Sequence, residues 1–322
     1  MRAALLRGFG ILPEASDVAP PEGGNGRALV RVTAAPINLL DLLIGSGRFY
    51  GGAPEPPYVP GVEGVGTVVK ADGLEPGTRV WFSFERFDAA RGSMAELCAV
   101  DEERTVVLEH TLDDAVAAAL GLTGLAAWMS LSWRGKLEPG EQVLVLGAAG
   151  AVGQVALQAA RILGAGRVIG ASRSEEGRAI AQRLGADAVV DSSDGDVDTI
   201  AERMERACEG PLSLVIDPVW GDLATAALRA LAPGGRLVNF GSSAGIVAPL
   251  DSAVIRSKSL SVLGYTNVAL PFEDMRAAVS ALHQHAAAGR INPILDRVDL
   301  DELGSAWARA GESPHKKLVV MP

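Results

Sequence analysis

Two hydrophobic patterns follow one another along the chain. Between residues 27 and 110, short apolar or β-branched runs at 28–33 and 64–69 are separated by glycine and proline clusters, as at 51–57. Runs of this length between such clusters are typical of strands joined by turns. The first part of the chain is therefore predicted to be a domain rich in β-strands.

From about Asp113 onward, strand-like apolar runs alternate with alanine-rich segments of helical period. This alternation predicts a parallel sheet that helices cover on both faces. Six such runs with five connections match the complement of a Rossmann dinucleotide-binding fold. The six runs are residues 142–146, 167–171, 188–190, 212–216, 236–240 and 260–263.

The tail of the chain exceeds that complement, because it adds a helical segment at 272–288 and a last strand at 317–320. We therefore expect the tail to return to the first domain. The prediction is an α/β protein with three segments. Residues 1–120 form the β-rich domain, residues 121–264 form the nucleotide-binding domain, and residues 265–322 rejoin the first domain.

Composition narrows the class of protein. The 322 residues are 48% hydrophobic and 21% charged, which is enough material for two packed domains. A formal charge of -10 without any basic cluster argues against nucleic-acid binding. No run approaches the roughly 20 apolar residues of a membrane span, and Pro13 and Glu14 interrupt the N-terminal segment too early for a signal peptide. The chain is expected to be soluble and cytoplasmic, with no membrane partner.

The sharpest local signal is a glycine-rich turn after the first strand of the predicted Rossmann domain. Gly147, Gly150 and Gly153 are three residues apart, and an apolar-faced helix follows them. Such a turn leaves room for a pyrophosphate and points backbone N–H groups of a helix N-terminus at it. We assign Gly147, Gly150, Ala151, Val152 and Gly153 to cofactor binding. The alternative is an ordinary strand–helix turn whose glycines serve packing alone.

The end of the next strand bears on the choice between NADPH and NADH. An NAD site usually has a carboxylate there for the ribose 2′-hydroxyl, whereas this strand ends at Ser172 and Arg173. Both side chains could bind a 2′-phosphate, which favours NADPH. Ser172 could instead cap the next helix in a capping box with Glu175, and Arg173 could be solvated. Glu175 and Glu176 count against the NADPH assignment.

Several short motifs follow one another along the chain. They are residues 37–41 with Gly47 (Asn-x-x-Asp), 60–66 (Pro-Gly-x-Glu-x-x-Gly), 92–96, 122–123, 147–153, 217–219 and 239–241. Taken in this order, they resemble the motifs of the medium-chain dehydrogenase/reductase superfamily, and within it the zinc-free, zeta-crystallin-like quinone oxidoreductase branch. The resemblance implies a GroES-like catalytic domain beside the Rossmann domain, with the nicotinamide in the cleft between them. It also implies homodimers formed through the last strand of the nucleotide-binding sheet, at about 259–265.

Departures from zinc-dependent relatives predict that the chain binds no metal. Those relatives carry cysteine near the position of Asn38, histidine at the position of Val62, and a four-cysteine lobe that is absent here. Cys98 and Cys208 form no CxxC pattern, so no thiolate zinc site is expected. The four histidines offer no substitute set, because His283 and His285 would diverge on a helix, while His110 and His315 stand alone.

Other departures concern the cofactor and substrate pockets. The family tyrosine after the Asn-x-x-Asp segment aligns with Phe49, and Tyr50 follows it. The family lysine after the second strand of the nucleotide-binding sheet aligns with Gly177, which leaves Arg173 or Arg178 to compensate. A tyrosine after the third strand is Ser192 here. Trp220 replaces a glycine, where it could reshape the cleft or simply pack.

Without zinc, the chemistry that suits the chain is reduction of a conjugated acceptor. A zinc ion is what makes an alkoxide-like hydride donor accessible near neutral pH. A quinone or α,β-unsaturated carbonyl compound already spreads the incoming charge onto an oxygen, so hydrogen bonds can suffice. The sequence therefore predicts an NADPH-dependent quinone or enone reductase. Two alternatives stay open, a tailoring enoyl reductase acting on a polyketide-like or lipid enone, and a non-catalytic NADPH-binding structural or regulatory protein.

The resemblance assigns roles to several residues near the N-terminal motifs. Asn38 would contact the nicotinamide ribose or the substrate oxygen, although it could simply form a turn after Pro36. Tyr50 could donate a proton, or could be a packing or lid residue. Asp41 is expected to cap or brace local structure. Glu63 either lies near the cleft or is a buried carboxylate paired to an arginine.

The remaining candidates are expected to contact the cofactor. Thr123 would do so near the crossing between the domains, with a helix cap as the alternative. Ser192, Phe240 and Gly241 follow strands of the nucleotide-binding sheet and complete the predicted set. Lys317 could reach a cofactor phosphate, with a solvated terminal lysine as the alternative.

Overall fold

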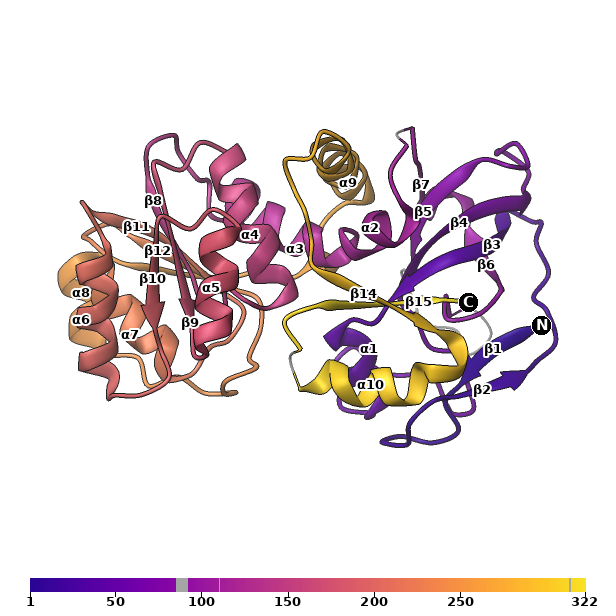
Figure 1. Cartoon of the computed structure of the whole chain (residues 1–322), viewed down its shortest axis with the longest axis horizontal. Helices are drawn as coiled ribbons and strands as arrows, with labels where there is room; N and C mark the ends of the chain where they lie inside the picture. The colour runs from indigo at the N-terminus through magenta and orange to yellow at the C-terminus, as the bar shows by residue number, and fades with distance from the viewer. Residues whose placement is uncertain (85–91, 110, 313) are drawn as a thin grey trace. The chain divides into compact units, whose positions relative to one another are not determined.

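The computed structural model describes residues 1–84, 92–109, 111–312 and 314–322, so His110 lies outside the described residues. The described residues form two compact units, shown in Figure 1. Unit 1 consists of Met1–Leu122 together with Phe272–Pro322, and unit 2 is Thr123–Pro271. No helix within the described ranges is both long and apolar enough to cross a membrane.

Unit 2 is built on a parallel sheet that, among the described residues, has six strands in the order β10-β9-β8-β11-β12-β13. This order reverses between β8 and β11, which is the switch point where doubly wound sheets bind dinucleotides. The predicted Rossmann fold is thereby confirmed. The strands are β8 (Gln142–Val145), β9 (Arg167–Ser172), β10 (Ala188–Asp191), β11 (Leu212–Asp217), β12 (Arg236–Asn239) and β13 (Ser261–Gly264).

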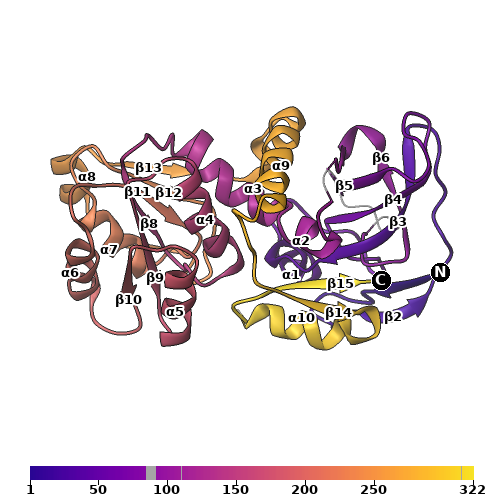
Figure 2. The ribbon, with the colours of Figure 1, turned by 45° about the horizontal axis from the view of Figure 1, so that its top comes forward.

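Helices cover both faces of the unit 2 sheet, as expected for a parallel sheet whose strands are apolar throughout. Figures 1 and 2 show α4 and α5 on one face and α6, α7 and α8 on the other. The helices are α3 (Leu122–Met129), a π-helical turn (Ser130–Arg134), α4 (Ala151–Ile162), α5 (Glu175–Arg183), α6 (Val197–Ala207), α7 (Asp222–Ala230), α8 (Ser252–Lys258) and a 3-10 turn (Asn267–Ala269).

Unit 1 contains the predicted β-rich domain. Its larger sheet runs β14-β15-β3-β4-β5-β7 with β6 on β3, and β1 pairs with β2 separately. The strands are β1 (Arg2–Leu5), β2 (Glu14–Asp17), β3 (Arg27–Pro36), β4 (Glu63–Lys70), β5 (Arg79–Ser83), β6 (Leu97–Asp101), β7 (Thr105–Val107), β14 (Leu295–Asp299) and β15 (Lys317–Met321). The helices are α1 (Leu39–Gly45), α2 (Asp114–Ala119), α9 (Phe272–Ala287) and α10 (Leu303–Gly311), with 3-10 turns at Glu102–Arg104 and Leu300–Glu302.

The C-terminal strand β15 is inserted beside β3, and this pairing positions the site described below. Val319 pairs with Pro36 and Val320 with Ala35 in antiparallel register. The N–H of Ile37 then donates to the carbonyl of Leu318 at 2.9 Å. The residues just after β3 therefore lie beside the first residue of β15, although about 280 positions separate them in the sequence.

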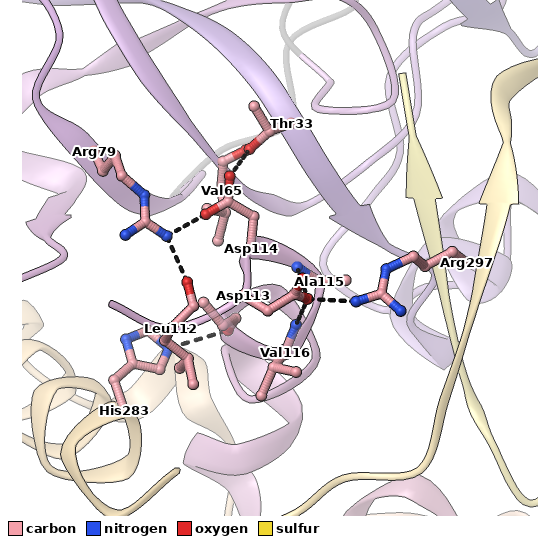
Figure 3. A network of polar contacts seen from close by, with 11 residues as sticks. Thr33, Val65, Arg79, Leu112, Asp113, Asp114, Ala115, Val116, His283 and Arg297 are labelled. Atoms are coloured by element: carbon pink, nitrogen blue, oxygen red, sulfur yellow. Dashed lines mark hydrogen bonds and ion pairs between the residues drawn. The ribbon is translucent and has the colours of Figure 1, made fainter. Parts of the chain in front are cut away.

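A polar network holds α2 in place within unit 1 (Figure 3). Asp113 caps α2 and also accepts from Arg297 at 2.7 Å. Asp114 forms an ion pair with Arg79, which donates to the carbonyl of Leu112 as well. On α9, the Nε2 atom of His283 lies 3.0 Å from the carbonyl of Ala117 in α2. These contacts fix the first turn of α2, and the chain then passes from its carboxyl end to Leu122, whose N–H donates to Glu63.

The core of unit 1 includes two large aromatic side chains from β5. Trp81 and Phe82 are fully buried, and burial of one such side chain contributes roughly 1.5–3 kcal/mol. A buried indole N–H needs a hydrogen-bond acceptor, because leaving it unpaired would cost about 1–3 kcal/mol. Trp81 donates to Glu63, so the packing of this core fixes a carboxylate of the candidate site.

Candidate functional site

The centre of the site in unit 1 is a contact between Asn38 and Lys317. The Lys317 Nζ atom donates to the Asn38 Oδ1 atom at 2.6 Å. Asn38 is 7% exposed and Lys317 only 5% exposed. The alternative of a solvated terminal lysine is therefore wrong. Asn38 is also more than a turn residue after Pro36, because its amide joins two separate parts of the chain.

Glu63, the first residue of β4, is fully buried and is the third member of the cluster. Its Oε1 atom accepts from the Asn38 Nδ2 atom at 3.0 Å. Its Oε2 atom accepts from the Trp81 Nε1 atom at 2.9 Å and from the backbone N–H of Leu122 at 2.7 Å. These donors stand in place of the arginine that the sequence left open as the partner of Glu63.

Asp41 braces the loop around Asn38, as the sequence suggested. Its Oδ2 atom accepts from the Asn38 backbone N–H at 2.8 Å, and its Oδ1 atom accepts from the Val62 N–H at 3.0 Å. The same carboxylate thus joins the start of α1 to the turn before β4. This arrangement holds the Asn38 backbone next to Glu63.

Burial dominates the electrostatics of the cluster. It raises the pKa of Asp41 to about 7, against the hydrogen bond from the Asn38 backbone and the charge of Lys317. Burial likewise raises the pKa of Glu63. It lowers the pKa of Lys317 to about 8, although both carboxylates act in the opposite direction. One buried ammonium group therefore faces two buried carboxyl groups. Burial disfavours the charged form of each group, because a buried charge has lost its hydration.

Two residues of the cluster, Trp81 and Gly121, were not identified as site residues from the sequence. Trp81 lies in an ordinary apolar strand and carries no motif signal. At Gly121, a β-carbon would lie 1.8 Å from Glu63 Oε2 and 2.3 Å from Trp81 Nε1. Its position directly before the 122–123 motif was the one available hint. Glycine is required there because any side chain would displace the carboxylate or the indole.

Tyr50 lies apart from this cluster. It is 84% exposed, and its ring packs at 4.6 Å, centroid to centroid, on Phe49. No hydrogen bond joins its hydroxyl to any part of the chain that the structure describes. The structure therefore brings together Asn38 and Lys317 from the predicted set, but leaves Tyr50 on a surface loop.

In unit 2, the glycine-rich turn connects the end of β8 to α4. Gly147 has a φ of +59°, which favours glycine. A β-carbon at Gly153 would lie 2.3 Å from the Gly147 carbonyl oxygen, so the turn can close only around glycine. No side chain caps α4 at Gly150, and the N–H groups of Ala151 and Val152 begin the helix. An open, uncapped helix N-terminus in a glycine cradle fits the pyrophosphate of a dinucleotide.

The structure at the end of β9 shows that the helix cap considered for Ser172 is wrong. The cap of α5 is Ser174, whose hydroxyl accepts from the Gly177 N–H at 3.0 Å. The capping box of Ser172 with Glu175 is therefore wrong. Ser172 is the last residue of β9 and is buried. Its side chain occupies the space beside Gly177.

Two arginines lie close to the end of β9 in different settings, because Arg173 follows the strand directly and Arg178 lies in α5. The Arg178 Nη1 atom donates to the carbonyls of Ser172 and Arg173 and pairs with Asp191 at 2.9 Å. Arg173 is exposed. Ser192 is buried next to them, and its N–H donates to the Ser172 carbonyl at 3.3 Å. Donors suited to a phosphate thus gather where the resemblance places the ribose of the cofactor.

Phe240 and Gly241 follow the carboxyl end of β12, a strand of the unit 2 sheet. The Phe240 N–H donates to the carbonyl of Asp217 at 3.1 Å. A β-carbon at Gly241 would lie 2.3 Å from the Pro218 carbonyl oxygen. Thr123 is buried in the first turn of α3. Of the three, Phe240 and Gly241 border the edge of the sheet at which doubly wound folds bind ligands.

Trp220 adopts a backbone conformation that is unusual for a bulky residue, with a φ of +61°. The Asp217 Oδ1 atom accepts from its N–H at 2.8 Å, and the side chain packs partly against the core of unit 2. The packing alternative for Trp220 therefore has direct support. Among the described residues, no cluster of three or more histidine, cysteine, aspartate or glutamate side chains could hold a metal ion.

Two family models match the chain. The model described as alcohol dehydrogenase GroES-like domain matches residues 24–110. The model described as zinc-binding dehydrogenase matches residues 151–284. Together they cover parts of both units, in the order that the resemblance predicted.

Known proteins with similar sequences or structures include three informative cases. Quinone oxidoreductase-like protein 2 of Bos taurus is 32% identical over 289 residues, which are 86% of this chain and 80% of that protein. A phenolphthiocerol/phthiocerol polyketide synthase of Mycobacterium tuberculosis is 31% identical over 91% of this chain, but the match spans only 13% of that much longer protein. The quinone oxidoreductase of Thermus thermophilus, also solved in complex with NADPH, is 29% identical, with a TM-score of 0.80 over all of both chains.

Proposed function

The chain belongs to the zinc-free quinone oxidoreductase branch of the medium-chain dehydrogenase/reductase superfamily, and we propose that it transfers hydride from NADPH to a quinone or an α,β-unsaturated carbonyl compound without a metal ion. Its class, an oxidoreductase with a nicotinamide cofactor, follows from that membership. The acceptor, the preference for NADPH and the independence from zinc are the proposed parts.

One observation carries the choice of acceptor. The amide of Asn38 is held between the ammonium group of Lys317 and the carboxylate of Glu63. Asn38 and Val62 stand where zinc-dependent relatives have cysteine and histidine, and neither is a zinc ligand. An acceptor that needs only hydrogen bonds for its developing charge suits this set of side chains. A quinone or enone meets that condition because conjugation places the charge on its own oxygen.

Binding of NADPH is proposed to use unit 2. The turn from Gly147 to Gly153 would hold the pyrophosphate on the N-terminus of α4. Ser172, Arg173 and Arg178 would surround the 2′-phosphate, the group that distinguishes NADPH from NADH. When bound, the cofactor supplies the hydride, and the protein orients both reactants.

Protonation of the reduced acceptor is proposed to come from solvent. Tyr50 is the one candidate hydroxyl named by the sequence, and its exposure places it in water rather than in the buried cluster. Asn38 would orient the nicotinamide ribose or the acceptor oxygen. The main contribution of the protein to the rate is then positioning, for which effective concentrations can be very large.

An enoyl reductase for a polyketide-like or lipid enone is a second candidate. It is favoured by the polyketide synthase, part of which aligns with 91% of this chain. The two candidates share fold and cofactor and differ in the size of the acceptor. A third possibility, an NADPH-binding protein without catalysis, would leave every acceptor unreduced.

A homodimer through the edge of the unit 2 sheet is also proposed. Within the described residues, β13 pairs only with β12, so its other edge carries unpaired backbone groups. Val262 on this strand is 37% exposed. Addition of a second copy would cover both. Cytoplasmic location and the absence of nucleic-acid partners stay predictions from the sequence.

A panel assay tests the proposed function. Oxidation of NADPH is followed with a small benzoquinone, a short 2-alkenal and a bulky cyclic enone as acceptors. Turnover of the quinone or the alkenal supports the proposal, whereas turnover of the bulky enone alone supports the second candidate. If no acceptor is reduced while NADPH binds, the catalytic assignment is wrong.

A further inference from the structure

Lys317 occupies an unusual position for a lysine near the end of a chain. It is the first residue of β15, and its ammonium group is buried beside Asn38 rather than facing water. Burying a charged group costs free energy unless partners compensate for its lost hydration. Its neighbour Lys316 is half-exposed and pairs with Asp296 at 3.1 Å on the surface. Two adjacent lysines therefore have opposite environments.

We infer that Lys317 is a positioning residue that sets the orientation of the Asn38 amide for cofactor and acceptor, rather than a residue that binds a cofactor phosphate itself. This inference rests on the proposed function, because it concerns the residue to which that function assigns the contact with the reactants. It differs from the role that the sequence suggested, in which Lys317 reaches the cofactor directly.

The first argument is the chemistry of the partners. An amide can present either its oxygen or its nitrogen to a neighbour, and the two ends have similar shapes. An ammonium group only donates, so Lys317 selects the oxygen, at 2.6 Å. The Glu63 Oε1 atom accepts a hydrogen bond, so it selects the nitrogen, at 3.0 Å. The two contacts together leave the amide a single orientation.

The second argument is that the surroundings hold Lys317 and Glu63 at fixed places. The pairing of β15 with β14 fixes the Lys317 backbone, whose N–H donates to the Ile294 carbonyl at 2.8 Å. Glu63 is fixed by Trp81 and by the N–H of Leu122. Asp41 fixes the Asn38 backbone from the other side. An amide oxygen carries two lone pairs, so the atom that Lys317 orients can also serve a hydroxyl group of a reactant.

The test is a double-mutant cycle between Lys317→Met and Asn38→Ala, with Lys316→Met as the matched control. For each variant, the NADPH dissociation constant is measured by calorimetry, and kcat and KM are measured with the best acceptor of the panel. We expect Lys317→Met to repeat the loss caused by Asn38→Ala, on the order of tenfold, which corresponds to roughly 1.4 kcal/mol. The combined variant should be no worse than either single variant, and Lys316→Met should match wild type.

Additive losses in the double variant would overturn the inference. So would a loss of NADPH affinity in Lys317→Met with kcat unchanged, because a direct contact with a cofactor phosphate predicts that result. Lys317→Met also leaves Glu63 and Asp41 buried without a cation, which can impair folding. The cycle is therefore repeated in a Glu63→Gln background, which removes one of the two carboxylates and keeps a side chain of the same shape.

The NADPH dissociation constants test this inference separately from the proposed function. If wild type reduces no quinone or enone, the proposed acceptor class fails, but the NADPH dissociation constants still show whether Lys317 acts through Asn38. If turnover is found and the affinities are additive, only the role of Lys317 is wrong. Lys317→Arg adds a further check, because it keeps the charge but changes the shape of the donor, and it should recover part of the lost affinity.

Discussion

Gly177 and Ser172 lie so close that a β-carbon at residue 177 would be 2.2 Å from the Ser172 Oγ atom. By the resemblance, a family lysine aligns with Gly177, and a lysine there would have to displace Ser172. In the proposed NADPH site, the cation that pairs with the 2′-phosphate would therefore come from another residue. Arg178, one residue later, is tied to Asp191, whereas Arg173 is exposed.

We expect NADPH to bind more tightly than NADH, and Arg173→Ala to remove much of that preference. A hydrogen bond to a charged group contributes roughly 1.5–3 kcal/mol, so the loss of NADPH affinity should be about tenfold or more, with NADH affinity unchanged. Calorimetric titration with both cofactors measures it. Arg183→Ala, at the exposed end of α5, is the control. Equal affinities for the two cofactors in wild type would show that the 2′-phosphate is not recognised here.

The buried cluster should make the stability of the protein depend on pH. The pKa of Asp41 rises from 3.8 to about 7 on folding, so the folded state holds the proton more tightly. This stabilisation is present below pH 4 and is lost as the pH rises to about 7. The pKa of Lys317 falls from 10.5 to about 8. Its contribution is present above pH 10.5 and is lost as the pH falls to about 8.

We therefore expect the free energy of unfolding to fall less between pH 4 and 7 in Asp41→Asn than in wild type. The difference should be on the order of a few kcal/mol, because each pKa unit corresponds to about 1.4 kcal/mol. Denaturant unfolding at a series of pH values measures it. Asp17→Asn, an exposed residue of β2, is the control for ordinary surface carboxylates. If the two variants show the same pH dependence as wild type, Asp41 does not take up a proton on folding.

Zinc is expected to be absent from the purified protein, and chelators should leave its activity unchanged. By the resemblance, zinc-dependent relatives have cysteine near the position of Asn38 and histidine at the position of Val62, and neither an amide nor a valine side chain is a usual zinc ligand. Elemental analysis together with activity after dialysis against a chelator is the measurement. One bound zinc per chain, with turnover lost on its removal and restored by its return, would contradict the proposal.

The fold was predictable because patterns of neighbouring residues in the sequence indicate its strands, helices and turns. Apolar runs and helical segments alternate along the chain, and the glycines at 147, 150 and 153 mark the turn between a strand and a helix. The capping error arose at this local level as well. Ser172 and Ser174 both precede a possible first turn, and strand β9 extends one residue further than its apolar run, so the cap falls on Ser174.

The candidate site was only partly predictable, because its contacts are long-range. Asn38 and Glu63 lie in segments that carry the resemblance, and Lys317 was a separate candidate near the C-terminus. No periodicity could show that Asn38 and Lys317, 279 positions apart, meet through a hydrogen bond. Lys317 follows another lysine in a short polar segment, so a solvated side chain was a reasonable alternative. Its burial depends on strand pairing, because β15 lies between β14 and β3 in the sheet.

The last prediction concerns the source of the proton. Tyr50→Phe should lower kcat by less than the roughly 100-fold that removal of an essential general acid causes, because Tyr50 is exposed and its hydroxyl is outside the cluster. Asn38→Ala should instead impair both NADPH affinity and turnover, since its amide links Lys317 to Glu63. Steady-state kinetics with NADPH and a small quinone, combined with calorimetry, compare the two variants.

Phe49→Leu serves as the control for the packing of this loop, because the Phe49 ring contacts Tyr50 and the core of unit 1. If Tyr50→Phe loses all turnover while it binds NADPH normally, Tyr50 is the catalytic acid, and its loop must come to the reactants during the reaction. If Phe49→Leu and Tyr50→Phe reduce turnover to the same small extent, the loop contributes through packing alone. That result would agree with a proton supplied by solvent, because the hydroxyl of Tyr50 would then contribute no more than its ring packing does.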